Sequence, residues 1–203
     1  MRGGTRPKRS SPPTMSEQML RQIEDHGRVI DSLRKQVPLL QTMADRILQT
    51  FRDGGRVYLL GNGGSAADAQ HIAAELLGRY KRDRRPLPAV ALTTDSSTLT
   101  AITNDLGGQH VFVRQVEALA TDRDVVWALS VSGSSRNVLS AMESARRIGA
   151  CRFGFTGRNG ERLRTLCDYC FVADHESADR VQEAHVLAYH LICDRVEAAV
   201  ESR

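Results

Sequence analysis

The sequence predicts an α/β protein with a doubly wound, parallel, five-stranded sheet flanked by helices. Five short apolar runs occur between residues 56 and 174, and segments of helical periodicity separate them. The runs are continuous rather than alternating, which is typical of strands covered by helices on both faces. Two further helical segments precede the first run, and we expect them to form an N-terminal helical hairpin.

Residues 1–16 are expected to form a disordered basic tail, and residues 17–203 a single domain that includes the N-terminal helices. The first 14 residues carry four basic side chains and no acid, and without them the chain has 24 basic and 24 acidic residues. The folded part is therefore neutral, and we expect no nucleic-acid partner. The start has no apolar signal-peptide core, and no apolar run approaches the roughly 20 residues of a membrane span. We therefore expect a cytoplasmic protein that does not enter membranes.

The two N-terminal helical segments carry an apolar stripe. In the first it comprises Met19, Leu20, Ile23, Ile30, Leu33 and Val37, interrupted by the polar His26-Gly27 pair. In the second, after Pro38, it comprises Leu40, Met43, Ile47 and Phe51. A lone hairpin cannot hide this stripe, so it is expected to pack on the domain body or on another subunit.

The sheet follows in order along the chain. Its strands are predicted at "RVYLLG", "PAVALTT", "DVVWALS", "CRFGFTG" and "DYCFVAD". Helices are predicted over residues 66–77, 109–119, 136–148 and 160–166, with a last helix over 178–201. Ligands of such sheets bind beyond the carboxyl ends of the strands, so the loops after the strands are the places to look for function.

The loop after the first strand, "GNGGS" at residues 61–65, runs straight into a helix. Its glycines let the backbone approach a ligand, and the helix N-terminus favours an anion. Gly61, Gly63 and Ala66 also match the G-x-G-x-x-A pattern of dinucleotide-binding proteins. That pattern calls for an acid about 20 residues further on, whereas Asp95 comes about 30 residues on. A Walker P-loop is excluded because no Gly-Lys-Ser/Thr follows.

The loop after the third strand, "SVSGSSRN", offers hydroxyls at Ser130, Ser132, Ser134 and Ser135. Hydroxyls and backbone amides can bind a phosphate without a fixed positive charge. Serine and glycine are also ordinary turn and N-cap residues. The two loops together predict a site for a phosphate and for sugar hydroxyls.

Two pairs of polar residues could bind a metal ion. His71 and Glu75 stand at i and i+4 on one helix face, and Gln182 and His190 lie on the last helix. The latter two are about 12 Å apart along the helix, so both could reach one ion only from opposite ends. Exposed His/Glu pairs are common on helices, so these residues alone leave a metal site and an ordinary polar surface both open.

Cys167 and Cys170 form a C-x-x-C inside the strand-like run "CDYCFVA". Neither lies at a helix N-terminus, and no second C-x-x-C completes a four-thiolate site. We interpret them as ordinary reduced cysteines.

The motifs "GNGGSAADAQHIAAEL", "TTDSSTLTAITNDLG", "SVSGSSRNV", "FTGRNG" and "DRVQEAHVLAYH" resemble those of the bacterial phosphoheptose isomerases of the sugar isomerase (SIS) superfamily. The likeness covers roughly residues 19–201. It implies a flavodoxin-like SIS fold and conversion of D-sedoheptulose 7-phosphate to D-glycero-D-manno-heptose 7-phosphate through an enediol. It also implies a homotetramer with active sites between subunits and one Zn²⁺ per subunit. In such a tetramer, a neighbouring subunit is the expected partner of the apolar stripe on the N-terminal helices.

Residue by residue, the resemblance assigns zinc to His71, Glu75, Gln182 and His190. Glu75 is the candidate base and His190 the candidate proton shuttle. A carboxylate bound to zinc is a poorer base, so this interpretation requires Glu75 to change roles during turnover. Substrate contacts are expected at Asn62, Gly63, Gly64, Ser65, Glu75, Asn104, Asp105, Ser130, Val131, Ser132, Ser135 and Gln182.

One departure concerns the serine loop, where the family commonly has Ser-Thr-Ser-Gly-Asn-Ser and this chain has "SVSGSS". The side-chain hydroxyl at Val131 is therefore missing. A non-catalytic SIS module that binds a sugar phosphate or a protein is the alternative function. Such a relative lacks the residues that match Glu75 and His190, whereas this chain has both.

Overall fold

Five parallel strands form the predicted sheet in the computed structural model of the chain, which describes residues 13–200. They are β1 (Val57–Gly61), β2 (Ala89–Ala91), β3 (Val125–Leu129), β4 (Cys151–Gly157) and β5 (Tyr169–Ala173). Their order across the sheet is β2-β1-β3-β4-β5. The chain turns from β1 to one side and then to the other, which creates a switch point between β1 and β3.

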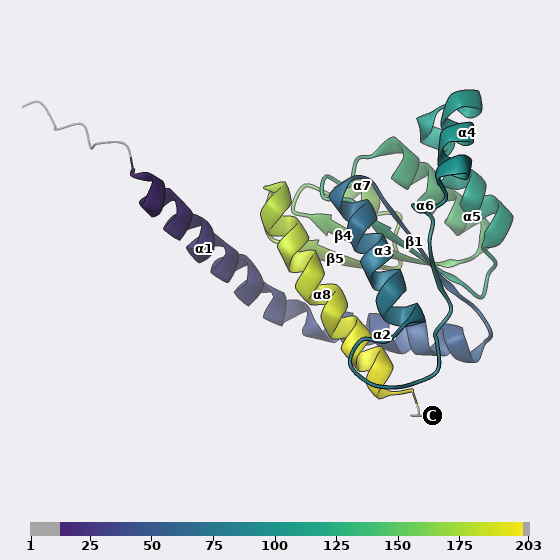
Figure 1. Cartoon of the computed structure of the whole chain (residues 1–203), viewed down its shortest axis with the longest axis horizontal. Helices are drawn as coiled ribbons and strands as arrows, with labels where there is room; N and C mark the ends of the chain where they lie inside the picture. The colour runs from purple at the N-terminus through teal and green to yellow at the C-terminus, as the bar shows by residue number, and fades with distance from the viewer. Residues whose placement is uncertain (1–12, 201–203) are drawn as a thin grey trace, which may run out of the picture.

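Helices cover both faces of the sheet (Figure 1). One face carries α2 (Val37–Arg52), α3 (Gly64–Leu77) and α8 (Ala178–Ala198). The other carries α4 (Ser96–Leu106), the 3₁₀ turn η2 (Gly108–His110), α5 (Val113–Leu119), α6 (Arg136–Ile148) and α7 (Glu161–Arg164). Among residues 13–200, no helix combines the length and the apolar character that a bilayer crossing requires.

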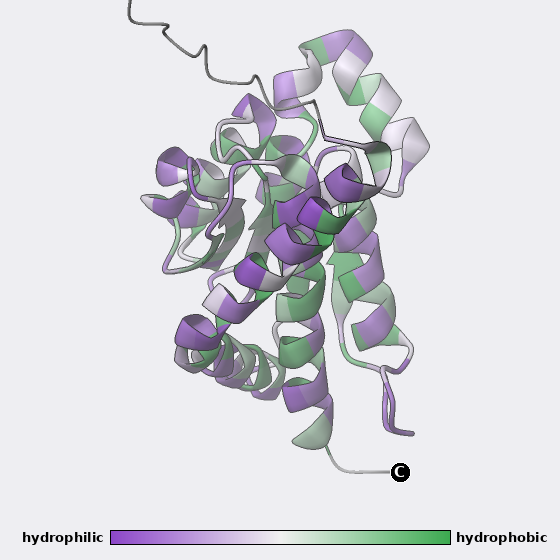
Figure 2. Ribbon diagram, turned by 90° about the vertical axis from the view of Figure 1, so that its left-hand side faces the viewer, coloured by the Kyte–Doolittle hydropathy of each residue, from purple (hydrophilic) through white to green (hydrophobic). Residues whose placement is uncertain are grey.

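The sheet separates two hydrophobic cores. Along β1, Val57 and Leu59 enter the core shared with α2, α3 and α8, whereas Tyr58 and Leu60 enter the core shared with α5 and α6. This alternation follows from the two-residue period of a strand. All five residues of β1 and of β3 are buried, as the continuous apolar runs predicted. Figure 2 shows the hydrophobic residues concentrated on the strands and on the helix faces against them.

His185 in the terminal motif belongs to the core. Its ring is fully buried beside Phe155 and Phe171, and its Nε2 lies 3.3 Å from the carbonyl oxygen of Thr156. Burial lowers the pKa of His185 to about 4, so the ring stays neutral at physiological pH.

The N-terminal helices do not form the predicted hairpin. Helix α1 (Met15–Ser32) runs unbroken through His26-Gly27, and the 3₁₀ turn η1 (Leu33–Gln36) leads on into α2. α1 projects from the body while α2 packs against α8 (Figure 1). A single glycine costs a helix only about 1 kcal/mol, too little to force a break. A capping box between Thr14 and Glu17 starts α1, so the helix begins inside the tail predicted over residues 1–16, of which residues 1–12 lie outside the described part.

The projecting half of α1 exposes the apolar stripe. Met19 is 60% and Ile23 is 66% exposed, whereas Leu33 near the body is buried. Within one chain, the N-terminal part of the stripe therefore has no cover among the described residues.

Helix α4 was not predicted. Its sequence is rich in serine and threonine, which are weak helix formers, so the local signal is poor. Asp95 caps the helix by accepting a hydrogen bond from the backbone N–H of Thr98 (3.0 Å), and Gly107 follows its end. Capping and packing therefore outweigh the weak propensity.

Candidate active site and metal centre

The glycine and serine loops meet at the switch point of the sheet. Gly61 and Leu129 pair in register at the ends of β1 and β3, so the loops that follow lie side by side. Between them is a cavity of about 340 Å³. Its lining comprises Asn62, Ser65, Leu129, Ser130, Val131, Ser132, Ser135, Ala178 and Gln182. The structure thus brings most of the predicted substrate-binding residues to one place.

The cavity has the features of a phosphate site. The first turns of α3 and α8 contribute Ser65 and Ala178, and α6 begins directly after Ser135. The positive dipole ends of these helices therefore lie at the cavity. The Ser135 hydroxyl makes no capping hydrogen bond within the described chain, which leaves it available to a ligand. None of the described residues that line the cavity is charged.

Two glycines are closely packed beside this cavity. A Cβ at Gly64 would lie 2.3 Å from the side-chain nitrogen of Gln182. Gly133 has a φ of +60°, and a Cβ there would lie 2.5 Å from the Cα of Gly160. A larger residue at Gly64 would therefore push the flexible side chain of Gln182 aside, whereas one at Gly133 would strain the backbone and clash with that of Gly160.

Asn62 connects this cavity to a second one of about 350 Å³ that Gly63 also lines. The amides of Asn62 and Asn137 exchange two hydrogen bonds of 2.9 Å and tie the glycine loop to α6. Asn137 was not predicted, although it lies in the "SSRNV" motif.

The second part of the site is a cluster of side chains on α3 and α8 that could hold a metal ion. One ligand atom each from His71, Glu75 and His190 lie within 4.8 Å of one another. The Nε2 of His71 is 3.0 Å from Oε1 of Glu75. Two imidazoles and one carboxylate are a donor set of catalytic zinc sites, in which each ligand atom lies about 2 Å from the ion. The cluster therefore fits a zinc ion.

Two tyrosines lie against the cluster. The ring of Tyr80 stacks on His190 with centroids 5.4 Å apart, and the hydroxyl of Tyr189 lies 2.9 Å from Nδ1 of His71. Burial and the neighbouring His71 lower the pKa of His190. Burial raises the pKa of Asp68, next to Tyr189, to about 6. The sequence reasoning missed Tyr80, Tyr189 and Asp68, although Asp68 lies three residues before His71 and hence on the same helix face.

Gln182 lies at the end of the site that is formed by the glycine and serine loops. Helices α3 and α8 run side by side in the same direction, with Gln182 against Gly64 and His190 against His71 (Figure 1). His71, the first residue of the cluster, is about 9 Å from Ser65 along the axis of α3. Gln182 thus lines the cavity between the glycine and serine loops, and its role as a fourth metal ligand stays a prediction.

Asn104 and Asp105 lie elsewhere in the single chain. They occupy the end of α4, where the side chain of Asn104 donates a hydrogen bond of 2.8 Å to Asp105. Asp105 lines a different cavity, of about 580 Å³, between α4 and α5. Their substrate contacts stay a prediction.

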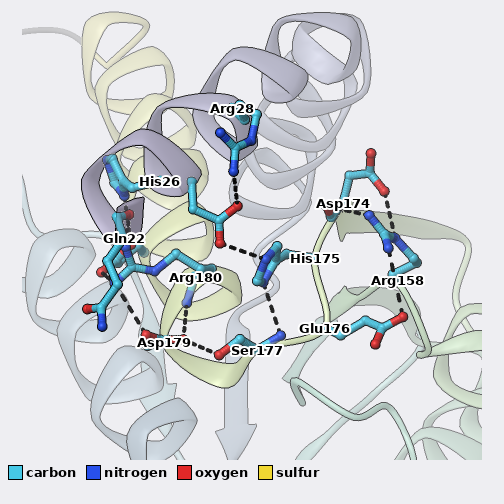
Figure 3. A network of polar contacts seen from close by, with 12 residues as sticks. Gln22, His26, Arg28, Arg158, Asp174, His175, Glu176, Ser177, Asp179 and Arg180 are labelled. Carbon is cyan, nitrogen blue, oxygen red and sulfur yellow. Dashed lines mark hydrogen bonds and ion pairs between the residues drawn. The ribbon is translucent and has the colours of Figure 1, made fainter. Parts of the chain in front are cut away.

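A polar network joins α1 to the start of α8 and to the loop before it (Figure 3). Arg180 donates a hydrogen bond of 2.7 Å to the backbone oxygen of Gln22. His26 lies 2.6 Å from Glu183, and His175 lies 3.1 Å from Asp25. The network fixes the turn of α8 that carries Gln182 relative to the projecting helix.

The C-x-x-C pair lies apart from both parts of the site. Cys167 and Cys170 are free thiols above Gly154 on β4. The hydrogen bond with Cys170 and burial raise the pKa of the Cys167 thiol, so it stays protonated. In the described part of the chain, the one cluster of three histidine, cysteine or acidic residues close enough to share an ion is that of His71, Glu75 and His190.

Comparison with known proteins places this geometry among sugar-phosphate enzymes. The SIS domain family model matches residues 23–157. The phosphoheptose isomerase of Pelobacter propionicus is 49% identical over 167 residues, 82% of this chain and 88% of that protein. The structure of phosphoheptose isomerase GmhA from Neisseria gonorrhoeae has a TM-score of 0.86 at 37% identity, covering 92% of this chain and all of that one. The structure of a phosphoheptose isomerase from Francisella tularensis has a TM-score of 0.88 at 30% identity, and it also covers 92% of this chain and all of that one.

Proposed function

We propose that this chain, which belongs to the SIS domain family, is an aldose-ketose isomerase that converts D-sedoheptulose 7-phosphate to D-glycero-D-manno-heptose 7-phosphate. One observation carries the proposal. Side chains from residues 71, 75 and 190 meet in a cluster suited to proton transfer and metal binding, in a chain that is 49% identical to a phosphoheptose isomerase.

The reaction requires one proton to leave C1 of the ketose and one to be added at C2, with an enediol between the two steps. Glu75 is the base that takes the proton from C1, because its carboxylate lies in the cluster and its side chain is largely buried (18% exposed). His190 moves protons at the sugar oxygens or at C2. Its lowered pKa favours the neutral ring, which can accept a proton and return it.

The cluster supplies three of the expected ligands for one Zn²⁺ per subunit, namely His71, Glu75 and His190, and Gln182 is the proposed fourth. The ion would polarise the sugar carbonyl and stabilise the negative charge of the enediol oxygens. The cavity at the serine loop binds the phosphate through Ser130, Ser132, Ser135 and backbone N–H groups. Val131 contributes its backbone there, because it has no hydroxyl.

The activity is tested directly with purified protein and sedoheptulose 7-phosphate. We expect formation of the aldose, a loss of at least about tenfold in rate after treatment with a chelator, and recovery on addition of Zn²⁺. Metal analysis should give one zinc per chain. A protein that lacks both metal and turnover yet binds a sugar phosphate or a protein partner would instead be a non-catalytic SIS module. Binding of NAD or NADP in a titration would favour the dinucleotide interpretation.

We also propose a homotetramer whose contacts cover the exposed stripe on α1 and complete the sites with residues such as Asn104 and Asp105. The large exposed side chains of α1 support this, because a monomer rarely leaves such a stripe uncovered. Ile23→Lys should shift the mass measured by light scattering from tetramer to smaller species. Leu119→Lys changes a 47% exposed leucine outside α1 and is the control. A monomeric wild-type protein, or a tetrameric Ile23→Lys protein, would contradict the proposal.

We place the reaction in the cytoplasm. The four cysteines are free thiols, as expected in a reducing compartment. Recovery of the protein in an exported fraction of its source cells would contradict this.

A further inference from the structure

Tyr189 links the cluster of His71, Glu75 and His190 to the half-buried carboxylate of Asp68. It directly precedes His190 on α8, and its ring is fully buried. Its hydroxyl lies 2.9 Å from Nδ1 of His71 and 3.5 Å from Oδ1 of Asp68. The ring meets His71 and His190 edge-on, with centroids 5.4 and 4.8 Å away. Tyr189 is therefore in contact with both histidines of the cluster.

The two nitrogens of His71 have different partners. Nε2 faces Glu75 at 3.0 Å, and Nδ1 faces the hydroxyl of Tyr189. To bind a metal ion through Nε2, a neutral imidazole must carry its hydrogen on Nδ1. That hydrogen is then donated to the oxygen of Tyr189, whose own O–H points to Asp68. The chain of donors runs in one direction and ends on a carboxylate, as outer partners of metal-binding histidines commonly do.

Asp68 is the last member of this series of hydrogen bonds, and it has a free acceptor there. Its second oxygen, Oδ2, is buried and accepts no hydrogen bond from the described residues. Asp68 lies one turn before His71 on α3, so one helix carries both the carboxylate and the imidazole that Tyr189 connects.

We propose that Tyr189 is a positioning residue of the metal site. Its hydroxyl selects the tautomer of His71 that leaves Nε2 free for the ion, and it holds the ring so that Nε2 faces Glu75 and His190. This inference rests on the proposed zinc site, and it concerns a residue outside the expected ligand set.

The experiment compares Tyr189→Phe with Tyr58→Phe. Both changes delete one hydroxyl from a buried ring, and the hydroxyl of Tyr58 bonds the backbone oxygen of Leu119 (3.0 Å) on the far side of the sheet. Zinc is titrated into metal-free full-length protein in competition with a chromophoric chelator. The absorption spectrum of the cobalt-loaded protein is also recorded, together with the urea midpoint of each variant.

We expect Tyr189→Phe to bind zinc about 10- to 100-fold more weakly and to change the cobalt spectrum, the usual effect of losing an outer partner. Tyr58→Phe should leave both unchanged. Wild-type zinc affinity and cobalt spectrum in Tyr189→Phe would overturn the inference while leaving the zinc site in place, and so would equal losses in the two variants. A wild-type protein that binds no zinc would overturn the zinc site and this inference together.

Discussion

Glu75→Gln is expected to lower kcat by about a thousandfold, within the range that removal of a general base or acid produces. The amide has the shape of the carboxylate and retains an oxygen toward His71, but it cannot take a proton from C1. KM for sedoheptulose 7-phosphate should change little, because the proposed phosphate contacts are distant from Glu75. Ser65, at the cavity, is about 15 Å from Glu75 along α3. Turnover is measured at saturating substrate and saturating zinc, so that weaker metal binding does not lower the rate.

Glu143→Gln is the matched control. Glu143 is an exposed glutamate on α6, away from the cluster, and its variant should retain wild-type kcat. A folded Glu75→Gln protein with near wild-type turnover would remove Glu75 from the role of base.

Glu197→Ala is expected to destabilise the protein by about 3–5 kcal/mol. Glu197 is 1% exposed and accepts hydrogen bonds from the backbone N–H groups of Tyr80 (2.8 Å), Lys81 (2.7 Å) and Arg82 (2.9 Å). It also lies 3.4 Å from the buried guanidinium of Arg84. Burial alone would raise the pKa of Glu197, but these hydrogen bonds and the charge of Arg84 outweigh it and lower the pKa. Alanine would leave the three N–H groups and a buried cation without their partner.

Asp194→Ala is the matched control for Glu197→Ala. Asp194 pairs with Lys81 and Arg82 on the same loop, but it is 41% exposed, and its loss should cost at most about 1 kcal/mol. Both free energies of unfolding are measured in urea at one protein concentration, because assembly would add to stability. Equal losses in the two variants would show that burial of Glu197 adds nothing to its contribution.

The sheet and the glycine and serine loops were predictable because their signals are local. Continuous apolar runs identify buried strands, and the topology of a parallel sheet brings the ends of β1 and β3 together. The prediction of an N-terminal helical hairpin was wrong, because the sequences of two consecutive helices do not determine the angle between them. That angle depends on the packing of α2 against α8, which lies far away in the sequence.

The cluster of His71, Glu75 and His190 could be predicted only in part from the residues themselves. The spacing of His71 and Glu75 predicts one helix face, but it cannot show that His190 is the residue that faces them. The resemblance supplied that pairing, and the structure brings these three side chains together. Tyr189 and Asp68 were missed because a tyrosine beside a histidine and an aspartate on a helix are ordinary until their contacts are known.

The pairing of α3 with α8 also has a consequence for the order of events during synthesis. The glycine loop and His71 leave the ribosome long before His190, which is 119 residues further on. Strands β2 to β5 lie between them in the sequence, so the proposed metal centre can form only after α8 has been made and has docked beside α3. Uptake of the proposed zinc ion is therefore expected to be a late step in the maturation of the chain, and a nascent chain that stalls before α8 would have the glycine and serine loops but not the complete proposed metal site.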